Sequence, residues 1–117
     1  MMDNQQRGER GEQLALAYLQ AQGYVLLEKN WRTGHKELDL IMRQEDVVVF
    51  VEVKARSSAA FGTPGEAVDR RKQKKLLEAA QTYLYERGLL EAPARMDVAE
   101  VDLLSGQVRH LINAFGE

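Results

Sequence analysis

Three charged residues near the middle of the chain have the types and the spacing that metal-assisted hydrolysis requires. Asp39 precedes Glu52 by thirteen positions, and Lys54 follows Glu52 by two, just after the apolar run VVVFV. Two adjacent carboxylates repel one another unless a proton or a cation joins them. Carboxylate oxygens suit a hard divalent ion, and an ammonium group beside them could hold a water molecule or stabilise an attacked phosphate.

Two strands joined by a tight turn would bring these residues together. Residues 37–43 (ELDLIMR) and 47–56 (VVVFVEVKAR) have strand character, and the turn is expected at Glu45–Asp46. A hairpin about this turn places Asp39 opposite Glu52, where like charges destabilise the pair unless a cation joins them. A shift of one residue in register would send Asp39 to the opposite face, so the site depends on this register.

An ordinary structural ion pair is the alternative to a functional site. The same register places Glu37 opposite Lys54, and pairs of opposite charge are common across neighbouring strands. Both faces of residues 47–51 are apolar, which predicts a central strand that is covered on both sides. The charged residues then lie where this covered strand emerges at its C-terminal end.

The rest of the pattern predicts helices packed on a mixed sheet. A first helix is expected over residues 8–23 and a second over 69–87, each with apolar residues at helical spacing and a glycine at or just after its end. Further strands are expected at 24–31, 96–104 and 108–115, with a turn at 32–36 and a loop over 57–67. The order αβββαββ indicates an α/β fold with a mixed central sheet flanked by helices, in one domain spanning residues 1–117.

Composition limits the class of protein. The 117 residues are 44% hydrophobic and 29% charged, and they include no cysteine, which excludes disulfides and thiolate metal sites. A net charge of −2 argues against a protein that coats nucleic acid through bulk charge. The apolar run at 47–51 is far too short to span a membrane, and the first ten residues do not resemble a secretory signal. A cytoplasmic protein without membrane association is therefore expected.

Several short motifs together carry a family resemblance. They are GERGE (8–12), GY (23–24), ELD (37–39), FVEVKAR (50–56), FG (61–62), KQ (72–73) and RMDV (95–98). On these motifs the chain resembles the UPF0102 (YraN-like) family from about residue 8 to residue 101. The Asp and Glu-x-Lys pattern is similar to that of the PD-(D/E)xK nuclease superfamily and of archaeal Holliday-junction resolvases. One departure is that His35 and Lys36 stand where the family usually has a glycine before its first acidic motif.

The resemblance implies a restriction-endonuclease-like fold and an endonuclease that uses Mg²⁺ or Mn²⁺ to cut DNA, with branched or single-stranded DNA among the expected substrates. It assigns metal binding to Asp39, Glu52, Glu12 and the backbone carbonyl of Val53. It assigns catalysis to the same three acids and to Lys54 as the catalytic lysine. Apart from the resemblance, the low basic content favours a homodimer or a partner protein that supplies further DNA contact, since a DNA junction needs two cuts.

Basic residues and glycines are the candidates for contact with nucleic acid. RRKQKK (70–75) places five cations in the opening turns of the second helix, at the end where the helix dipole disfavours them. Lys72 and Gln73 coincide with the KQ of the family and are the expected phosphate contacts, together with Arg56. Gly8 and Gly11, at the expected helix start, could admit a phosphate to exposed N–H groups. A solvated charged face and a frayed helix start are the alternatives.

Two other constellations have simpler interpretations. Trp31 could stack on a base but is expected to close the edge of the core, and Arg95 with Asp97 is interpreted as a structural ion pair. Two alternative functions also stay open. One is a non-catalytic nucleic-acid-binding module with the same fold, whose affinity would fall with salt. The other is a scaffold protein in which the charged residues form a structural network.

Overall fold

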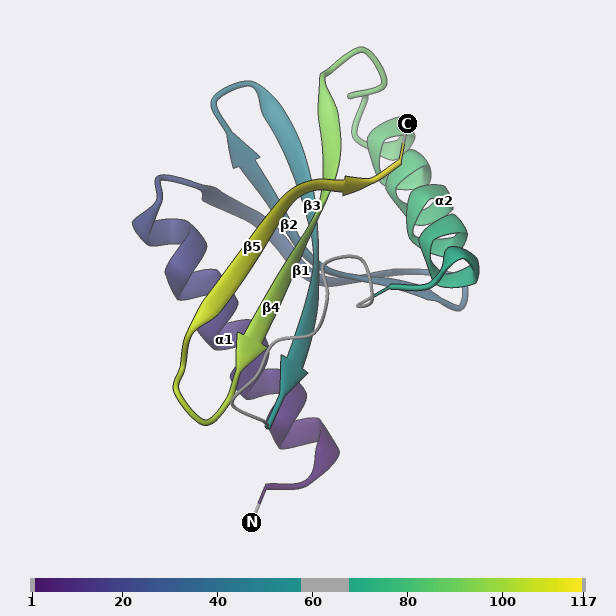
Figure 1. Cartoon of the computed structure of the whole chain (residues 1–117). Helices are drawn as coiled ribbons and strands as arrows, with labels where there is room; N and C mark the ends of the chain where they lie inside the picture. The colour runs from purple at the N-terminus through teal and green to yellow at the C-terminus, as the bar shows by residue number, and fades with distance from the viewer. Residues whose placement is uncertain (1, 58–67, 117) are drawn as a thin grey trace.

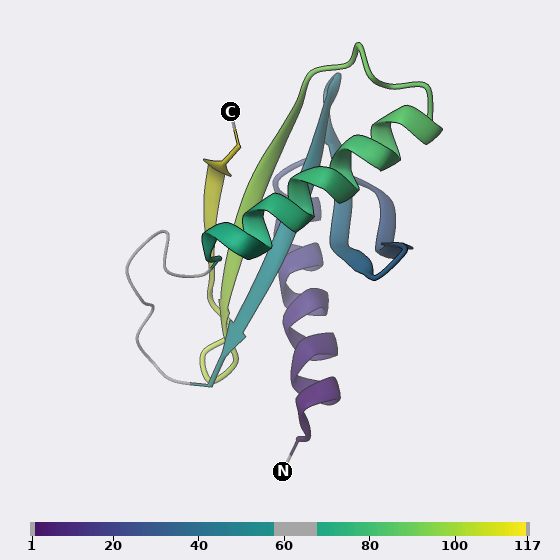
Figure 2. The same ribbon diagram turned by 90° about the vertical axis from the view of Figure 1, so that its right-hand side faces the viewer.

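The computed structural model describes residues 2–57 and 68–116, which form one five-stranded sheet with a helix on each face (Figures 1 and 2). The elements are α1 (Asn4–Ala21), β1 (Val25–Thr33), β2 (Lys36–Gln44), β3 (Val47–Arg56), α2 (Arg70–Glu86), β4 (Ala94–Asp102) and β5 (Val108–Phe115). The predicted order αβββαββ is confirmed. The expected loop over 57–67 lies, beyond Ser57, outside the described residues. Neither helix in the described part of the chain is apolar over a length that would cross a membrane.

The sheet is mixed, as predicted. Its strands follow the order β1-β2-β3-β4-β5, so each strand lies beside its neighbours in sequence. β3 and β4 are parallel, whereas the other three pairs are antiparallel. A parallel pair needs a long crossover, and α2 supplies it between the two strands (Figure 1). This topology makes β3 the central strand.

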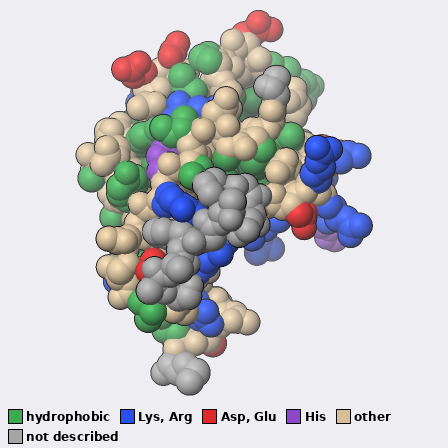
Figure 3. Space-filling model, in the orientation of Figure 1, with side chains coloured by type: hydrophobic (Ala, Val, Ile, Leu, Met, Phe, Trp, Pro, Cys, Tyr) green, Lys and Arg blue, Asp and Glu red, His purple; other side chains and the backbone are tan. Residues whose placement is uncertain are grey.

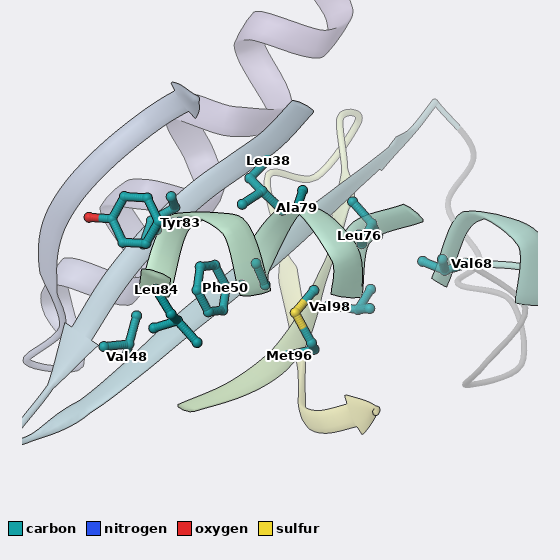
Figure 4. Close-up of a cluster of buried hydrophobic side chains, with 12 residues drawn as sticks. Leu38, Val48, Phe50, Val68, Leu76, Ala79, Tyr83, Leu84, Met96 and Val98 are labelled. Carbon is teal, nitrogen blue, oxygen red and sulfur yellow. The ribbon is translucent and has the colours of Figure 1, made fainter. Parts of the chain in front are cut away.

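Each helix covers its own face of the sheet with a separate apolar cluster. α1 packs mainly against β3 and β4, where its buried Ala15 and Leu19 meet Val49 and Val51. α2 packs mainly against β2, and Figure 4 shows its apolar side chains above Phe50 and other residues of the opposite face. The apolar residues of β3 are thus buried on both sides, which confirms the prediction of a covered central strand.

The first helix begins earlier than the sequence pattern predicts. Asp3 is its N-cap and accepts a hydrogen bond from the backbone N–H of Gln6, whose side chain accepts from the N–H of Asp3 in return. Only the first few N–H groups of a helix lack an internal partner. Gly8 and Gly11 therefore lie inside the helix, and the expectation that they offer exposed N–H groups at a helix start is wrong.

The hairpin of β2 and β3 has the predicted register. Its pairs run from Gln44–Val47 to Leu40–Val51, and the turn places Glu45 at a positive φ of 54°. Glu37 and Lys54 do not form the expected cross-strand ion pair. Glu37 instead faces Arg32 of β1, with the guanidinium Nε 3.6 Å from a carboxylate oxygen. β1 competes for Glu37 because β2 lies between two strands and not at an edge.

Candidate functional site

Two hollows in the surface meet at the acid pair formed by Asp39 and Glu52. The first, here called the α1 hollow, has a volume of about 370 Å³ and lies between α1 and the C-terminal half of β3. The second, the α2 hollow, has a volume of about 350 Å³ and lies beside the start of α2. Asp39, Glu52 and Lys72 line both hollows. The α1 hollow is also lined by Glu12, Val53 and Lys54, so it brings together every residue that the sequence predicts for catalysis or metal binding.

The carboxyl groups of Asp39 and Glu52 interact directly. Glu52 is almost completely buried, at 4% exposure, although it ends an apolar strand. Burial, the charge of Glu52 and a hydrogen bond between the two groups raise the pKa of Asp39 from its usual 3.8 to about 8, against a hydrogen bond from Val53 that lowers it. Ionisation of Asp39 is therefore disfavoured beside Glu52 when no cation is bound.

Backbone geometry fixes the position of Asp39. The N–H of Val53 donates a hydrogen bond of 2.9 Å to a carboxylate oxygen of Asp39, where the regular pairing of β2 with β3 has ended at Leu40–Val51. The N–H and C=O of one strand residue point toward the same neighbour. The carbonyl of Val53 therefore faces the Asp39 side of the strand.

Lys72 supplies the positive charge next to Glu52. Its ammonium Nζ lies 2.8 Å from a carboxylate oxygen of Glu52, and its side chain is about half exposed, at 48%. Burial lowers the pKa of Lys72, but the hydrogen bond and the charge of Glu52 outweigh burial and leave the pKa raised. The residue expected to contact phosphate therefore lies at the acid pair itself.

Lys54 faces the α1 hollow from the same side of β3 as Glu52, two residues further along the strand. Within the described part of the chain, its ammonium group makes no hydrogen bond or ion pair. An ammonium group in this state is available to a water molecule or to a phosphate that enters the hollow.

Glu12 reaches the α1 hollow from the helix on the other side of the strand. Its carboxylate accepts a hydrogen bond of 3.1 Å from the side-chain amide of Asn30. Burial raises the pKa of Glu12, although this hydrogen bond opposes the effect. Asn30 was not among the sequence candidates, because its approach to Glu12 depends on how α1 packs beside β1.

The donor set at the acid pair fits Mg²⁺ or Mn²⁺. The two carboxyl groups offer hard oxygen ligands once Asp39 has lost its proton, and the carbonyl of Val53 faces the Asp39 side of the strand. Mg²⁺ commonly binds through one or two carboxylates and keeps several water ligands. Among residues 2–57 and 68–116, no three His, Cys, Asp or Glu side chains lie close enough to bind one metal ion. Glu12 therefore fits a contact through water better than direct ligation.

The other predicted contacts with nucleic acid lie outside the acid pair or are buried. Gln73 uses its side-chain amide to donate to the carbonyl of Val68, and Arg56 lies 3.7 Å from the buried Glu100. Gly8 lines the α1 hollow. Gly11 is buried, and a Cβ atom there would lie 2.7 Å from that of Ala55, so an open surface at Gly11 is excluded.

The structure agrees with the interpretation of Trp31 as a residue at the edge of the core and of Arg95 with Asp97 as a structural ion pair. Trp31 packs edge-to-face on Tyr83, with the ring centroids 5.2 Å apart, at the margin of the core. Arg95 forms an ion pair of 3.0 Å with the fully buried Asp97, which also contacts His110 at 2.7 Å. Neither pair lines the two hollows.

The sequence candidates missed several residues of the α2 hollow. Its lining includes His35 from the turn between β1 and β2, Lys36 at the start of β2, and Arg71 and Lys75 from α2. The run RRKQKK indicates that cations are present, but it does not show which of them face the acid pair. That depends on the rotation of α2 about its axis, which its apolar residues set by packing on the sheet.

Comparison with solved structures finds matches that include the following two. One is the crystal structure of an fdxN element excision controlling factor protein from Anabaena variabilis, at a TM-score of 0.45 and 11% identity, covering 90% of this chain and 99% of that one. The other is Pyrococcus furiosus SfsA in complex with Ca²⁺, at a TM-score of 0.42 and 17% identity, covering 94% of this chain and 63% of that one. Similarity at this level says nothing about chemistry.

Sequence comparison gives a firmer result. Residues 11–101 match the uncharacterised protein family UPF0102. A UPF0102 protein of Clostridioides difficile strain 630 is 43% identical over 114 residues, which cover 97% of this chain and 100% of the relative. A UPF0102 protein of Alkaliphilus oremlandii is 45% identical, with coverage of 96% and 99%. The family resemblance seen in the short motifs is thereby confirmed, and the chain belongs to the UPF0102 family.

Proposed function

We propose that this protein is a Mg²⁺- or Mn²⁺-dependent endonuclease that hydrolyses phosphodiester bonds of DNA. One observation carries the proposal. The buried carboxyl group of Glu52 and the half-buried carboxyl group of Asp39, which holds its proton more tightly than usual, lie in the same hollow as an ammonium group, Lys54, that has no partner in the described part of the chain. Removal of the proton would leave two adjacent negative charges, a state that a divalent cation stabilises.

Five residues of the α1 hollow have a chemical role in this proposal. Asp39, Glu52 and the carbonyl of Val53 would hold the metal ion, which supplies Lewis-acid polarisation of the phosphate and a water of lowered pKa. Lys54 would orient the attacking water and stabilise the negative charge that develops on the phosphate. Glu12, held by Asn30, would position water at the side of the hollow that faces α1.

Branched and single-stranded DNA are the substrates we propose to test first, because the acid and lysine motifs resemble those of junction resolvases. A homodimer would allow two cuts at one junction, and we propose this arrangement for the branched substrate alone. The cytoplasm is the proposed location, as expected for a nuclease that acts on cellular DNA.

A non-catalytic nucleic-acid-binding module is the second candidate, and one observation favours it. Both acids already have protein partners, since Asp39 accepts from the N–H of Val53 and Glu52 is paired with Lys72. In such a module these contacts would not be exchanged for metal ligation, and the acid pair would have a structural role.

A cleavage assay separates the two functions. Labelled junction, flap, single-stranded and duplex DNA are incubated with the native chain and Lys54→Ala, in Mn²⁺, Mg²⁺ or EDTA. The nuclease predicts cutting that requires metal and falls by about 100-fold or more in Lys54→Ala, as for loss of one charge-stabilising group. Binding without cutting, unchanged in Lys54→Ala, would establish the binding module instead.

A further inference from the structure

The cations at the start of α2 separate into two pairs of the same composition. Arg71 and Lys75 line the α2 hollow beside the acid pair. Arg70 and Lys74 line a different hollow on the outer side of the helix. Each pair contains one arginine and one lysine four residues apart, so its two side chains lie on one helix face. The two faces are rotated from one another by about 100° about the helix axis.

Lys72 and Gln73, the other two residues of the run RRKQKK, already bind groups of the protein. Lys72 forms its ion pair with Glu52, and the side chain of Gln73 bonds to the carbonyl of Val68. Arg71 and Lys75 are exposed, and neither makes a hydrogen bond or ion pair within the described part of the chain. Arg71 and Lys75 are therefore the cations of the α2 hollow that are available to bind an external anion. Lys36, the next cation of this hollow, lies 3.7 Å from Glu78.

These cations are unfavourable for the helix itself. The first turn of α2 contains four cations or polar residues and no acidic residue, and the acidic Asp69 is its N-cap. A cation near the N-terminus of a helix opposes the helix dipole, by about 0.3–1 kcal/mol in exposed positions. Figure 3 shows Lys and Arg side chains gathered at the edge of the molecule where α2 begins. An anion bound there would offset both the dipole and the mutual repulsion of the cations.

We propose that Arg71 and Lys75 form a phosphate-binding subsite for a nucleic-acid strand that passes through the α2 hollow to the acid pair. The inference rests on the proposed function, since the hollow shares Asp39 and Glu52 with the candidate active site. Contacts with phosphate position a strand without reading its sequence. The subsite would thus hold the backbone on the α2 side of the phosphate to be cut.

The test compares two double variants that have the same composition and net charge. Arg71→Gln/Lys75→Gln removes the cations of the α2 hollow, and Arg70→Gln/Lys74→Gln is the matched control on the outer face. Binding of a labelled single-stranded DNA is followed by fluorescence anisotropy in EDTA, across a series of salt concentrations. The absence of metal prevents turnover, so binding is measured independently of cleavage. Thermal unfolding of both variants shows whether the helix is intact.

Two phosphate contacts contribute about 1.4 to the slope of log affinity against log salt for single strands. We therefore expect Arg71→Gln/Lys75→Gln to flatten the slope by that amount and to weaken binding roughly 25-fold at 0.1 M salt. The control should change affinity by less than about threefold, because the Debye length at this salt is about 10 Å. The Tm of neither variant should fall, since each loses unfavourable cations.

Three results would overturn the inference. They are equal losses of affinity in the two variants, unchanged affinity in Arg71→Gln/Lys75→Gln, and absence of DNA binding by the native chain. The first two would leave the proposed function intact, provided that metal-dependent cutting is lost in Lys54→Ala. Failure of the proposed function shows itself separately, as binding without cutting in the cleavage assay.

Discussion

At the scale of single residues, the charge balance of the acid pair is the central feature. Glu52 is buried with Lys72 as its counter-charge, and the pKa of Asp39 is raised because burial, and then the negative charge of Glu52, disfavour its ionised form. In the metal-free protein, the proton of Asp39 and the ammonium group of Lys72 thus balance the two carboxyl groups. A divalent cation would provide two positive charges at the same place. This arrangement lets the fold tolerate the pair when no metal is bound.

The raised pKa of Asp39, about 8, predicts how stability depends on pH in metal-free protein. The folded chain binds the proton more tightly than the unfolded chain, so the free energy of unfolding falls as pH rises from about 4 toward 8. Asp39→Asn removes this loss of stability at high pH. An amide carries no charge, and its oxygen can still accept a hydrogen bond from the N–H of Val53. We expect its Tm in EDTA to exceed that of the native chain by several degrees at pH 8 and by little at pH 4, with about 1 kcal/mol giving roughly 4 °C.

Asp46→Asn is the control for this prediction, since Asp46 lies exposed in the turn between β2 and β3. Its Tm should follow that of the native chain at every pH. An Asp39→Asn variant that is less stable than the native chain at pH 8 would show that the acid pair is ionised and held by other charges.

At the scale of elements, the contact between α1 and β3 positions Glu12 relative to the acid pair. Gly11 allows this approach, because a Cβ atom at that position would lie only 2.7 Å from the Cβ of Ala55. Gly8, one turn earlier on the same helix, has no atom within 4 Å of the corresponding position. The two glycines of GERGE thus differ in role although the motif repeats them.

Alanine substitution should therefore change stability in opposite directions at these glycines. Gly8→Ala is expected to stabilise the chain by about 0.5–1 kcal/mol, because alanine favours the helix. Gly11→Ala gains the same helical preference but forces α1 away from β3, and overpacking of this kind costs about 1–3 kcal/mol. Urea unfolding of both variants measures the difference. Equal stabilisation by both substitutions would mean that α1 can shift without cost and that Gly11 does not fix its distance from the strand.

At the scale of the whole molecule, local patterns were enough to predict the element order and the hairpin register. The continuous apolar run at 47–51 identified the central strand, and the turn at Glu45–Asp46 fixed the pairing of Leu40 with Val51. The role of Gly11 and the contacts of Lys72 and Asn30 were not predictable in this way. They depend on how each helix is placed on the sheet, and packing between distant segments sets that placement.

Residue spacing alone predicted the candidate site only as far as it lies on one hairpin, whereas Glu12 of α1 and Lys72 of α2 were expected from the family resemblance. Asp39, Glu52, Val53 and Lys54 come from β2 and β3, so strand register alone brings them together. Arg71 and Lys75 belong to α2, which begins beside the acid pair and then crosses one face of the sheet (Figure 2). The run RRKQKK was recognisable in the sequence, but which of its cations face Asp39 and Glu52 was not.

Calorimetric titration with Mn²⁺ tests the central claim, a divalent-cation site at the acid pair, most directly because it needs no knowledge of the substrate. The native chain, Asp39→Asn and the control Asp46→Asn are titrated at pH 7 in two buffers of different ionisation enthalpy. We expect about one tight site per chain, binding that releases a proton from Asp39, and a loss of affinity of at least roughly tenfold in Asp39→Asn alone. Equal Mn²⁺ affinity in all three proteins, with no release of a proton, would contradict the account.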